Sequence, residues 1–403
     1  MLKAIGMYIF GGSNSIAVMQ SGYKIDRVLE ISEEIKETNS YHFVRNYPDI
    51  PIILPSEWQS EGYLDSLRDS DYDLFYANNP CSGLSAVNRL ASLHNPTNHY
   101  FYDVIHAISR IKPKHFLMEN APRLTTIGIP ILHELYDTLK HDYNILILND
   151  YAGNHSVPML RPRTVITGYR KDIYEDLGTP LFEPNKQKQL TVFDTIGDLY
   201  NEPIDGSTKL NHVENLDEYY KVFKPMFKDM TQGQTLVKCV IKDIDKYKDI
   251  YPKSFAHQIY RSHDRVLKGE GIWDKSPTRL NEQKHFPSLT SLCVFIHPTQ
   301  DRFLTIREYA RIMGYPDDFE FYEGGKLSYV QCMAQGVPVN FIKYILSQIN
   351  NIKQGKAKFV KTNLVYQNNN YETYCDNVSF NVSKLVGDKP LSSANRVQRK
   401  SFI

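Results

Sequence analysis

The 403-residue sequence has little net charge, no long hydrophobic run and no closely paired cysteines, and each absence excludes a class of protein. No segment has the roughly 18 consecutive apolar residues that a membrane-spanning helix requires. The first residues, MLKAIGMYIFGG, lack the basic start, long apolar stretch and small-residue cleavage site of a signal peptide. We therefore expect no membrane association and a cytoplasmic, intracellular location.

The cysteines and the charge balance also narrow the possibilities. No Cys-x-x-Cys pair occurs, so the spacing predicts neither a disulfide framework nor a zinc site, and we expect no metal ion. A net charge of +1 is not typical of a nucleic-acid-binding protein. Such binding depends, however, on the few Lys and Arg residues that meet phosphates, and not on the total. The five cysteines are Cys81, Cys239, Cys293, Cys332 and Cys375.

The first half of the chain alternates short apolar runs with helical patterns. This alternation predicts an α/β protein with a parallel sheet covered by helices. Ligands gather at the carboxyl ends of the strands in such sheets. Gly11-Gly12, Glu30, Cys81 and Glu119 all follow predicted strands, so we expect them to face one crevice. The expected strands are AIGMYIF, DRVLEIS, DYDLFYA, HFLMEN, YNILILND and TVITGY, and the expected helices are near 15–21, near 102–111 and in HELYDTLKHDY.

The strand-and-helix rhythm is lost between about Leu181 and His285, a segment rich in Asp, Lys and Tyr whose fold the pattern does not predict. We expect a main α/β domain at 1–185, completed by 322–352, and a smaller inserted domain at 186–321. A helix is expected from near Thr305, and the last amphipathic helix is NFIKYILSQI. The polar, Asn-rich stretch 353–403 is either disordered or a loosely packed extension.

Three short segments carry residues suited to chemistry on a pyrimidine ring: Asn79-Pro80-Cys81, Glu119-Asn120 and Arg161-Pro162-Arg163. A thiolate that adds to C6 of cytosine makes C5 nucleophilic enough to accept a methyl group from a sulfonium donor. A Pro-Cys turn would hold Cys81 rigid and partly exposed, near the positive end of a following helix. The alternative is that Cys81 is a small buried core residue.

On these residues the sequence resembles the DNA cytosine-5 methyltransferases, from about Met1 to Tyr169 and again from about Pro277 to Ile349. The resemblance implies a Rossmann-like methyltransferase sheet that binds S-adenosyl-L-methionine, with 186–321 as a target-recognition domain. It also implies methylation of cytosine C5 in double-stranded DNA, through a covalent bond from Cys81 to C6 of a base flipped out of the duplex. The catalytic residues would be Cys81, Glu119 and Arg163.

The resemblance assigns roles to the carboxylate and the arginines. Glu119 would contact N3 and the exocyclic amine of cytosine, and the apolar strand before it should raise its pKa. The alternative for Glu119 is a surface residue that caps a loop. Arg163 would lie at the cytosine O2, and Arg161 would be a structural or phosphate contact, with Ser85 as a second DNA-binding residue. A salt-bridged strand pair is the alternative for the arginines, and Asn120 is expected to organise its loop.

The cofactor loop departs from the family pattern. The family opens with Phe-x-Gly-x-Gly-Gly, whereas this chain has Tyr8-Ile9-Phe10-Gly11-Gly12-Ser13, with Phe10 in place of the first glycine. Met159 stands where the family has a Gln, and Gly336-Val337-Pro338-Val339 replaces Gly-Asn-Ser-Val. Glu30 would accept hydrogen bonds from the ribose, with Glu33 and Glu34 as alternatives. We expect S-adenosyl-L-methionine beside Phe10, Gly11, Gly12, Ser13, Glu30, Asn79 and Pro80.

The segment LTIREYARIMGYPDDF closely matches a family run, and Arg307, Glu308 and Arg311 are expected to clamp a hinge between domains. The candidate partners are double-stranded DNA and a cognate restriction endonuclease. Two alternative functions remain: an RNA cytosine-5 methyltransferase, and a DNA-binding regulatory relative that has lost productive cofactor binding. The basic residues expected to read DNA, or else to be solvated surface, are Lys238, Lys242, Lys246, Lys248, Lys253, Arg261 and Arg265.

Overall fold

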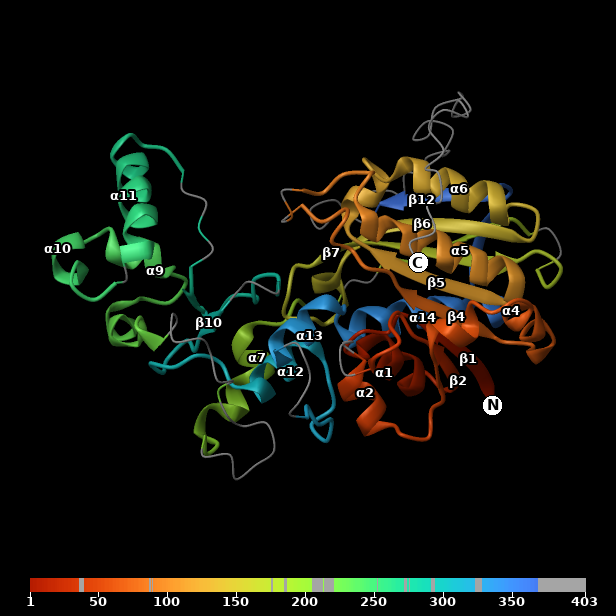
Figure 1. The fold of residues 1–403 in the computed structure, drawn as a ribbon, viewed down its shortest axis with the longest axis horizontal. Helices are drawn as coiled ribbons and strands as arrows, with labels where there is room; N and C mark the ends of the chain where they lie inside the picture. The colour runs from red at the N-terminus through yellow and green to blue at the C-terminus, as the bar shows by residue number, and fades with distance from the viewer. Residues whose placement is uncertain are drawn as a thin grey trace.

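A large sheet with helices on both faces and a smaller helical lobe make up the protein (Figure 1). The structure is a computed structural model. It describes residues 1–368 apart from 36–39, 87, 89, 175–176, 185–186, 205–212, 214–220, 252, 272–273, 275, 291–293 and 323–327. None of the helices within these described ranges has the length and apolar character needed to cross a bilayer.

The main sheet has eight strands in the order β12-β6-β7-β5-β4-β1-β2-β3. Every neighbouring pair is parallel except those of β7, which runs antiparallel to both β5 and β6. The carboxyl ends of the other seven strands therefore meet the start of β7 at one edge. The strands are β1 (Leu2–Met7), β2 (Tyr23–Leu29), β3 (Ile52–Ile53), β4 (Leu74–Asn78), β5 (His115–Asn120), β6 (Tyr143–Tyr151), β7 (Pro162–Arg170) and β12 (Leu364–Asn368).

Two hydrophobic cores lie on the two faces of this sheet. Successive residues of a strand point to opposite faces, so Ala4 packs in one core and Ile5 in the other. The first core contains α1 (Ser13–Gln20), α2 (Tyr41–Asn46) and α14 (Val339–Lys353). The second core contains α3 (Pro55–Trp58), α4 (Tyr63–Ser66), α5 (His99–Ile111) and α6 (Ile129–Leu139). The short helices η2 (Arg68–Ser70), η3 (Pro96–Asn98), η4 (Pro122–Thr125) and η5 (Ala152–His155) connect these elements.

Part of the expected C-terminal extension belongs to the sheet. β12 pairs in parallel with β6, and β11 (Lys358–Val360) pairs antiparallel with β8 (Thr179–Leu181). Leu364, Val365 and Tyr366 are buried in this short apolar run, which the polar composition of the surrounding sequence obscures. The main sheet therefore includes residues beyond 353, where we expected a separate extension to begin. The rest of the expected extension, 369–403, lies outside the described residues.

The helical lobe is formed by described residues of the segment between about Leu181 and His285, whose fold the sequence pattern does not predict. It contains η7 (Lys224–Asp229), α9 (Leu236–Val240), α10 (Ile244–Tyr247) and α11 (Lys253–Leu267), packed around a third hydrophobic core that includes Phe223, Phe227 and Phe255. Between the lobe and the sheet lie α7 (Val192–Ile196), η6 (Gly197–Asn201), β9 (Thr278–Arg279), β10 (Phe295–Ile296), α12 (Ile306–Met313) and α13 (Tyr329–Gln335) (Figure 1).

Three buried histidines should make the fold sensitive to mild acid. Burial lowers the pKa of His42 to about 4 and the pKa values of His115 and His297 to about 3. In the unfolded chain each titrates near 6.5, so below that pH the unfolded state binds protons that the folded state refuses. The free energy of unfolding, measured in urea from pH 7 to pH 5, should fall by up to about 1.4 kcal/mol per pH unit for each histidine.

His42→Asn provides the control, because an asparagine oxygen can replace His42 Nδ1 as the acceptor of the Tyr322 N–H, 3.1 Å away. The variant should lose stability less steeply than the wild-type protein over the same pH range. Stability that is constant from pH 7 to pH 5 would contradict the burial of neutral histidines.

Candidate active site

The edge of the sheet brings the three predicted catalytic residues together. Cys81 follows β4, Glu119 lies near the end of β5, and Arg163 lies near the start of the antiparallel β7. The strand register places Asn78 opposite Glu119, and Asn120 opposite Thr164. The start of β7 and the carboxyl ends of β4 and β5 therefore place these residues at the same edge of the sheet.

Glu119 and Arg163 form a buried ion pair. Arg163 Nε lies 3.1 Å from Glu119 Oε2, and Glu119 is 3% exposed. Burial raises the pKa of the Glu119 carboxyl, while Arg163 and Arg161 act in the opposite direction. The raised pKa means that Glu119 holds a proton more strongly than a solvated glutamate, as the apolar strand before it predicts.

Cys81 is half-buried and has a free thiol. Burial lowers the pKa of Arg161, and the positive charge of Arg163 lowers it further. Negative charge on Cys81 or Glu119 acts in the opposite direction, so these four side chains interact electrostatically. The helix expected directly after Cys81 is wrong. The described residues of 82–95, which exclude 87 and 89, contain turns and no helix, and the next helical element is η3.

Asparagine side chains explain why this segment is not helical. Asn88 Nδ2 donates to the Ser82 carbonyl at 2.8 Å, and Asn98 Nδ2 donates to the Ser92 and Leu93 carbonyls at 2.9 Å each. Such side chains offer the backbone an alternative to helical hydrogen bonds. Ser85, expected to contact DNA, is half-buried within the same loop.

Asn120 has the structural role expected for it. Its Nδ2 donates to the Asn79 carbonyl at 3.1 Å, and its Oδ1 accepts from the Ala121 N–H at 2.9 Å. These bonds tie the end of β5 to the turn that carries Pro80 and Cys81.

Arg161 is not available for DNA. It is 3% exposed, and its two terminal nitrogens donate to the carbonyls of Leu289 and Ala334. The expected phosphate contact of Arg161 is therefore wrong, and its hydrogen bonds to the two carbonyls support the structural role. Met159, fully buried where the family has a Gln, accepts a hydrogen bond on its sulfur from the Leu289 N–H at 3.5 Å. Both residues fasten the segment before β10 to the start of β7.

The glycines of the β1–α1 loop permit close packing. A Cβ on Gly12, which has a φ of 84°, would lie 2.4 Å from the Phe43 ring. A Cβ on Gly11 would lie 2.8 Å from the Tyr315 hydroxyl and 2.9 Å from the Cys332 carbonyl oxygen. The Gly11-Gly12 pair thus brings the start of α1 against α2 and α13 as well as toward the strand ends.

Two non-glycine residues of this loop adopt left-handed backbone conformations: Tyr8 with a φ of 57° and Phe10 with a φ of 46°. Sequence reasoning missed Tyr8, although it occupies the family's Phe position. Its hydroxyl donates to Asp103 at 3.2 Å, and its ring packs edge-on against Trp58 and Tyr100. Tyr8 therefore forms an aromatic wall beside the carboxyl end of β1.

The loop and strand ends have the polar groups that a cofactor would need. Asn14 and Asn78 are each 1% exposed, and their amide atoms have no hydrogen-bond partner among the described residues. Leaving such a group unpaired costs about 1–3 kcal/mol. Their positions, in the first turn of α1 and at the end of β4, suit the amine, carboxylate and hydroxyls of S-adenosyl-L-methionine. Asn14 and Asn78 were missed by the sequence analysis.

Glu30 is the best placed of the three expected ribose-binding carboxylates. It is 2% exposed at the end of β2, where its carboxylate accepts hydrogen bonds from the Ser40 hydroxyl and, at 2.6 Å, from the Ile31 N–H. Burial raises its pKa. Glu33, by contrast, is exposed and accepts from Ser56 N at 2.6 Å, and Glu34 is exposed.

The left-handed conformation at Phe10 predicts an unusual stability order. A left-handed φ costs a residue with a Cβ roughly 1 kcal/mol, so Phe10→Gly should be more stable than Phe10→Ala by about that amount. The pair removes the same aromatic ring and differs only in the Cβ. Urea unfolding of both variants provides the measurement.

Phe193 supplies the matched control, because it is a half-exposed phenylalanine inside helix α7. There the order should reverse, and Phe193→Gly should be less stable than Phe193→Ala by about 1 kcal/mol. The same order at both positions would contradict a strained Phe10.

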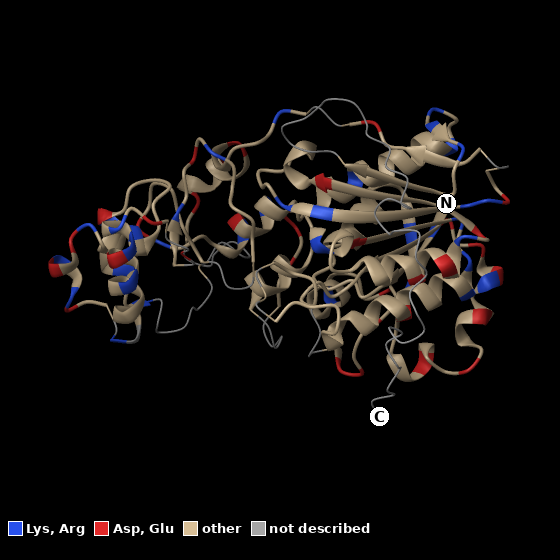
Figure 2. Cartoon of the chain, turned by 90° about the horizontal axis from the view of Figure 1, so that it is seen from above, with Lys and Arg blue, Asp and Glu red and all other residues tan. Residues whose placement is uncertain are grey.

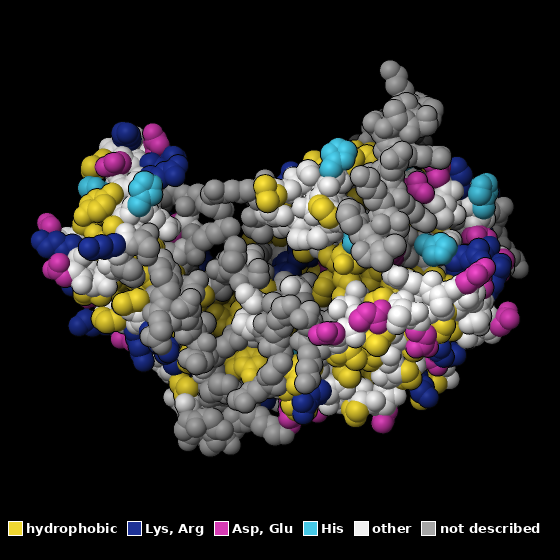
Figure 3. Space-filling view, in the orientation of Figure 1, with side chains coloured by type: hydrophobic (Ala, Val, Ile, Leu, Met, Phe, Trp, Pro, Cys, Tyr) yellow, Lys and Arg dark blue, Asp and Glu magenta, His cyan; other side chains and the backbone are white. Residues whose placement is uncertain are grey.

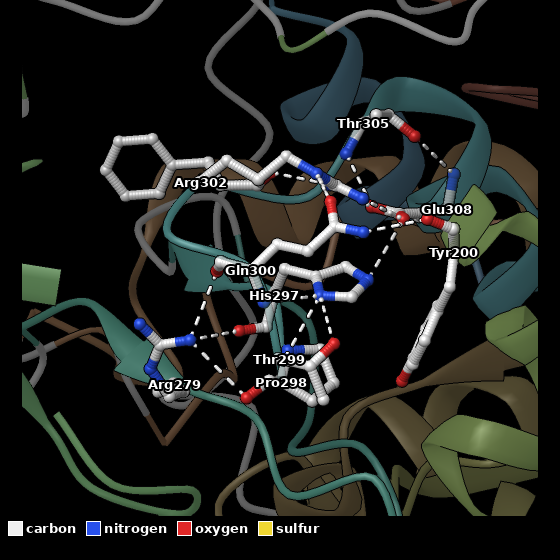
Figure 4. Close-up of polar contacts among 10 residues, drawn as sticks. Tyr200, Arg279, His297, Pro298, Thr299, Gln300, Arg302, Thr305 and Glu308 are labelled. Carbon is white, nitrogen blue, oxygen red and sulfur yellow. Dashed lines mark hydrogen bonds and ion pairs between the residues drawn. The ribbon is translucent and has the colours of Figure 1, made fainter. Parts of the chain in front are cut away.

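A buried polar network joins the lobe to the sheet domain (Figure 4). Glu308, at the start of α12, accepts hydrogen bonds from Arg302 at 2.9 and 2.8 Å and from the Thr305 N–H at 2.8 Å. Arg279 donates to the carbonyls of His297 and Phe227 at 3.0 and 2.7 Å. Glu308 thus has the clamping role expected of it, with Arg279, His297 and Arg302 as partners that sequence reasoning did not name.

Arg307 and Arg311 clamp a different place. Both pair with Asp317, and Arg311 also lies 3.0 Å from Asp198. These ion pairs join α12 to the segment that follows it and to η6. Because the side chains are partly exposed, each pair contributes little to stability.

Comparison with known proteins agrees with this geometry. The family model for C-5 cytosine-specific DNA methylases matches residues 10–351. The type II methyltransferase M.PspPI of Psychrobacter sp. is 29% identical over 287 residues, which span 66% of this chain and 61% of that protein. M.NgoPII of Neisseria gonorrhoeae, also a type II methyltransferase, is 22% identical over 86% of this chain and 95% of its own length.

Solved structures show the same fold at lower sequence identity. Entamoeba histolytica methyltransferase EhMeth is 13% identical with a TM-score of 0.53, over 88% of this chain and 99% of that one. Spodoptera frugiperda DNMT2 is 14% identical with a TM-score of 0.53, over 87% and 100%. With the family match, this chain belongs to the C-5 cytosine-specific DNA methylases. S-adenosyl-L-methionine is the methyl donor of that family.

Proposed function

We propose that this protein methylates C5 of cytosine in double-stranded DNA, with S-adenosyl-L-methionine as methyl donor and Cys81 as nucleophile. The observation that supports the proposal is the convergence of Cys81, Glu119 and Arg163 at one edge of the sheet, with Glu119 and Arg163 joined at 3.1 Å. A chain without this chemistry has no need of a half-exposed thiol beside a buried ion pair.

The reaction begins when the Cys81 thiolate forms a bond to C6 and the electrons of the C5–C6 double bond move toward C5 and N3. Glu119, whose raised pKa lets it carry a proton, donates to N3, and Arg163 holds the cytosine O2 and the carboxylate in place. Loss of the proton from C5 after methylation restores the double bond and breaks the Cys81–C6 bond, which returns the thiolate.

The residues beside β1, β2 and β4 would hold the methyl donor. Asn14, Asn78 and Glu30 supply buried polar groups, Gly11 and Gly12 shape the loop, and Phe10, Ser13, Asn79 and Pro80 border it. Bound there, S-adenosyl-L-methionine supplies an electrophilic methyl group.

The target base must leave the duplex for C6 to reach Cys81, at a cost of a few kcal/mol. A duplex would suit the hollow between the lobe and the sheet domain (Figure 3). Residues 186–321 would act as the target-recognition domain, although α7 and α12 within that range pack in the core of the sheet domain. Ser85, in the loop after Cys81, remains a candidate DNA contact.

Incubation with labelled S-adenosyl-L-methionine and DNA or RNA, followed by bisulfite sequencing, tests the proposal. We expect 5-methylcytosine in DNA within a fixed sequence context. Label in RNA alone would favour the RNA enzyme. No label in either, together with no binding of S-adenosyl-L-methionine by calorimetry, would favour the regulatory relative.

The names of the relatives suggest a biological setting. M.PspPI and M.NgoPII are type II methyltransferases, so we propose that DNA methylated by this protein in the cytoplasm resists a cognate restriction endonuclease. A plasmid prepared from cells that express the protein should survive digestion by an endonuclease that cuts the methylated sequence.

A further inference from the structure

We infer that Ser40 and Asn46 are positioning residues for the methyl donor, because together they hold the carboxylate of Glu30 in the orientation that binds the ribose. The inference rests on the cofactor site proposed at Glu30. Ser40 directly precedes helix α2 and Asn46 is its last residue, so the helix joins the two. Both act through Glu30, and neither is proposed to contact the donor.

Ser40 holds the carboxylate directly. It is 0% exposed, and its hydroxyl donates to one oxygen of Glu30, while the Ile31 N–H donates to the other at 2.6 Å. Burial raises the pKa of Glu30, and these two hydrogen bonds lower it. Donors of this kind favour the ionised form of a buried carboxyl group. The Ser40 hydroxyl therefore both orients Glu30 and keeps it an acceptor for ribose hydroxyls.

Hydrogen bonds, and not a neighbouring cation, hold this carboxylate. Within the described part of the chain, no Lys or Arg side chain pairs with Glu30. Trp58 Nε1 donates to the Glu30 backbone carbonyl at 2.8 Å, which fixes the main chain and not the carboxylate. The charges that Figure 2 shows on the sheet domain are of both signs and interspersed. The orientation of the carboxylate therefore depends on Ser40 and on the helix that follows it.

The other end of α2 is fastened to the segment that follows α12. Asn46 Nδ2 donates to the Glu320 carbonyl at 2.7 Å, and its Oδ1 accepts from the Glu320 N–H at 2.9 Å. Asn46 Nδ2 also donates to the His42 carbonyl at 2.8 Å, and His42 Nδ1 accepts from the Tyr322 N–H at 3.1 Å. We call these contacts, between 42–46 and 320–322, the α2 latch.

The latch fixes α2 to a buried part of the sheet domain. Phe319 and Phe321 are 2% and 7% exposed in the first core, so the segment that carries Glu320 is itself anchored. In Figure 1 this segment reaches α2 beside α1. With six residues, α2 is only about 9 Å long. A shift of Asn46 at one end therefore moves Ser40 at the other, and Glu30 with it.

Calorimetry of S-adenosyl-L-methionine binding to the full chain tests the inference. Ser40→Ala and Asn46→Ala should each weaken affinity about tenfold, because each removes hydrogen bonds that orient a charged acceptor. The KM for S-adenosyl-L-methionine should rise by a similar factor. The kcat at saturating donor should stay within about threefold of the wild type, because neither variant alters the catalytic residues.

Gln367→Ala is the matched control. Gln367 makes the same pair of bonds to a backbone as Asn46 does, donating to the Phe182 carbonyl at 2.7 Å and accepting from the Phe182 N–H at 3.1 Å. It lies in β12, at the opposite edge of the sheet from β2 and β3. Thermal unfolding should show comparable losses of stability in Gln367→Ala and Asn46→Ala, but Gln367→Ala should bind S-adenosyl-L-methionine like the wild type.

A double-mutant cycle shows whether Asn46 acts through Glu30. In a Glu30→Ala background, Asn46→Ala should weaken affinity by less than about threefold, because the carboxylate that it positions is gone. A full tenfold loss in that background, or wild-type affinity in Asn46→Ala and Ser40→Ala, would overturn the inference and leave the proposed function standing. If the wild-type protein itself binds no S-adenosyl-L-methionine, the proposed function and the inference fail together.

Discussion

Replacing Cys81 with serine should reduce methyl transfer to DNA by roughly 10⁴-fold or more, because a neutral hydroxyl cannot replace a thiolate as the nucleophile toward C6. Cys81 is half-buried in a turn and its thiol is free, so the substitution should leave the fold intact. Single-turnover transfer from labelled S-adenosyl-L-methionine measures the loss, and DNA affinity should stay within a few-fold of the wild type.

A second measurement detects the covalent bond itself. On a duplex with 5-fluorocytosine at the target position, fluorine cannot leave C5 as a cation, so the wild-type protein should remain attached to DNA on a denaturing gel. Cys81→Ser should form no adduct. Cys239→Ser is the control, because Cys239 lies in the core of the lobe, and this variant should still form the adduct. Normal methyl transfer by Cys81→Ser would rule out the covalent mechanism.

Glu119→Gln should slow methyl transfer by about 10²–10⁴-fold, the usual contribution of a positioned acid or base. The amide has the shape of the carboxyl group but cannot deliver a proton to N3. Because the side chain is buried against Arg163, the effect should appear in the rate of the chemical step and not in the affinity for DNA.

The pH profile distinguishes the acid role from a structural one. Burial raises the pKa of Glu119, so the protonated form persists above the usual range of a glutamate. Wild-type transfer that needs this proton should decline as the pH rises through the raised pKa, and the Glu119→Gln variant should lack this decline. A variant profile parallel to that of the wild type would show that Glu119 only positions the base.

Local sequence patterns predicted most strands of the main sheet, but the expectation of a parallel sheet was wrong for β7, which runs antiparallel to both of its neighbours. The expected strand HFLMEN, which contains Glu119, forms β5, the expected strand TVITGY forms most of β7, and Thr305 caps α12 in a capping box. These features depend on apolar periodicity and on nearby residues. Both signals can be recognised in a single sequence without knowing which distant segments pack against each other.

Contacts between distant segments could not be predicted in the same way. The sequence left open whether Arg161 is a structural or a phosphate contact, and only tertiary structure reveals that it binds the carbonyls of Leu289 and Ala334, more than a hundred residues away. β12 was missed because five residues in a polar context carry little periodic signal. The lobe was unassigned although α11 has 15 residues, because η7, α9 and α10 have only 6, 5 and 4 residues and are defined by the core that they share.

Helix α14 packs beside α1 and β2, so the two ends of the described fold meet: Lys353 donates to the Tyr23 hydroxyl across 330 residues. During synthesis the ribosome must therefore release the entire lobe before α14 can pack against the first β-α unit. Such distant pairing slows folding, and a nascent chain would leave the apolar face of α1 open to chaperones until nearly the last described residue has been made.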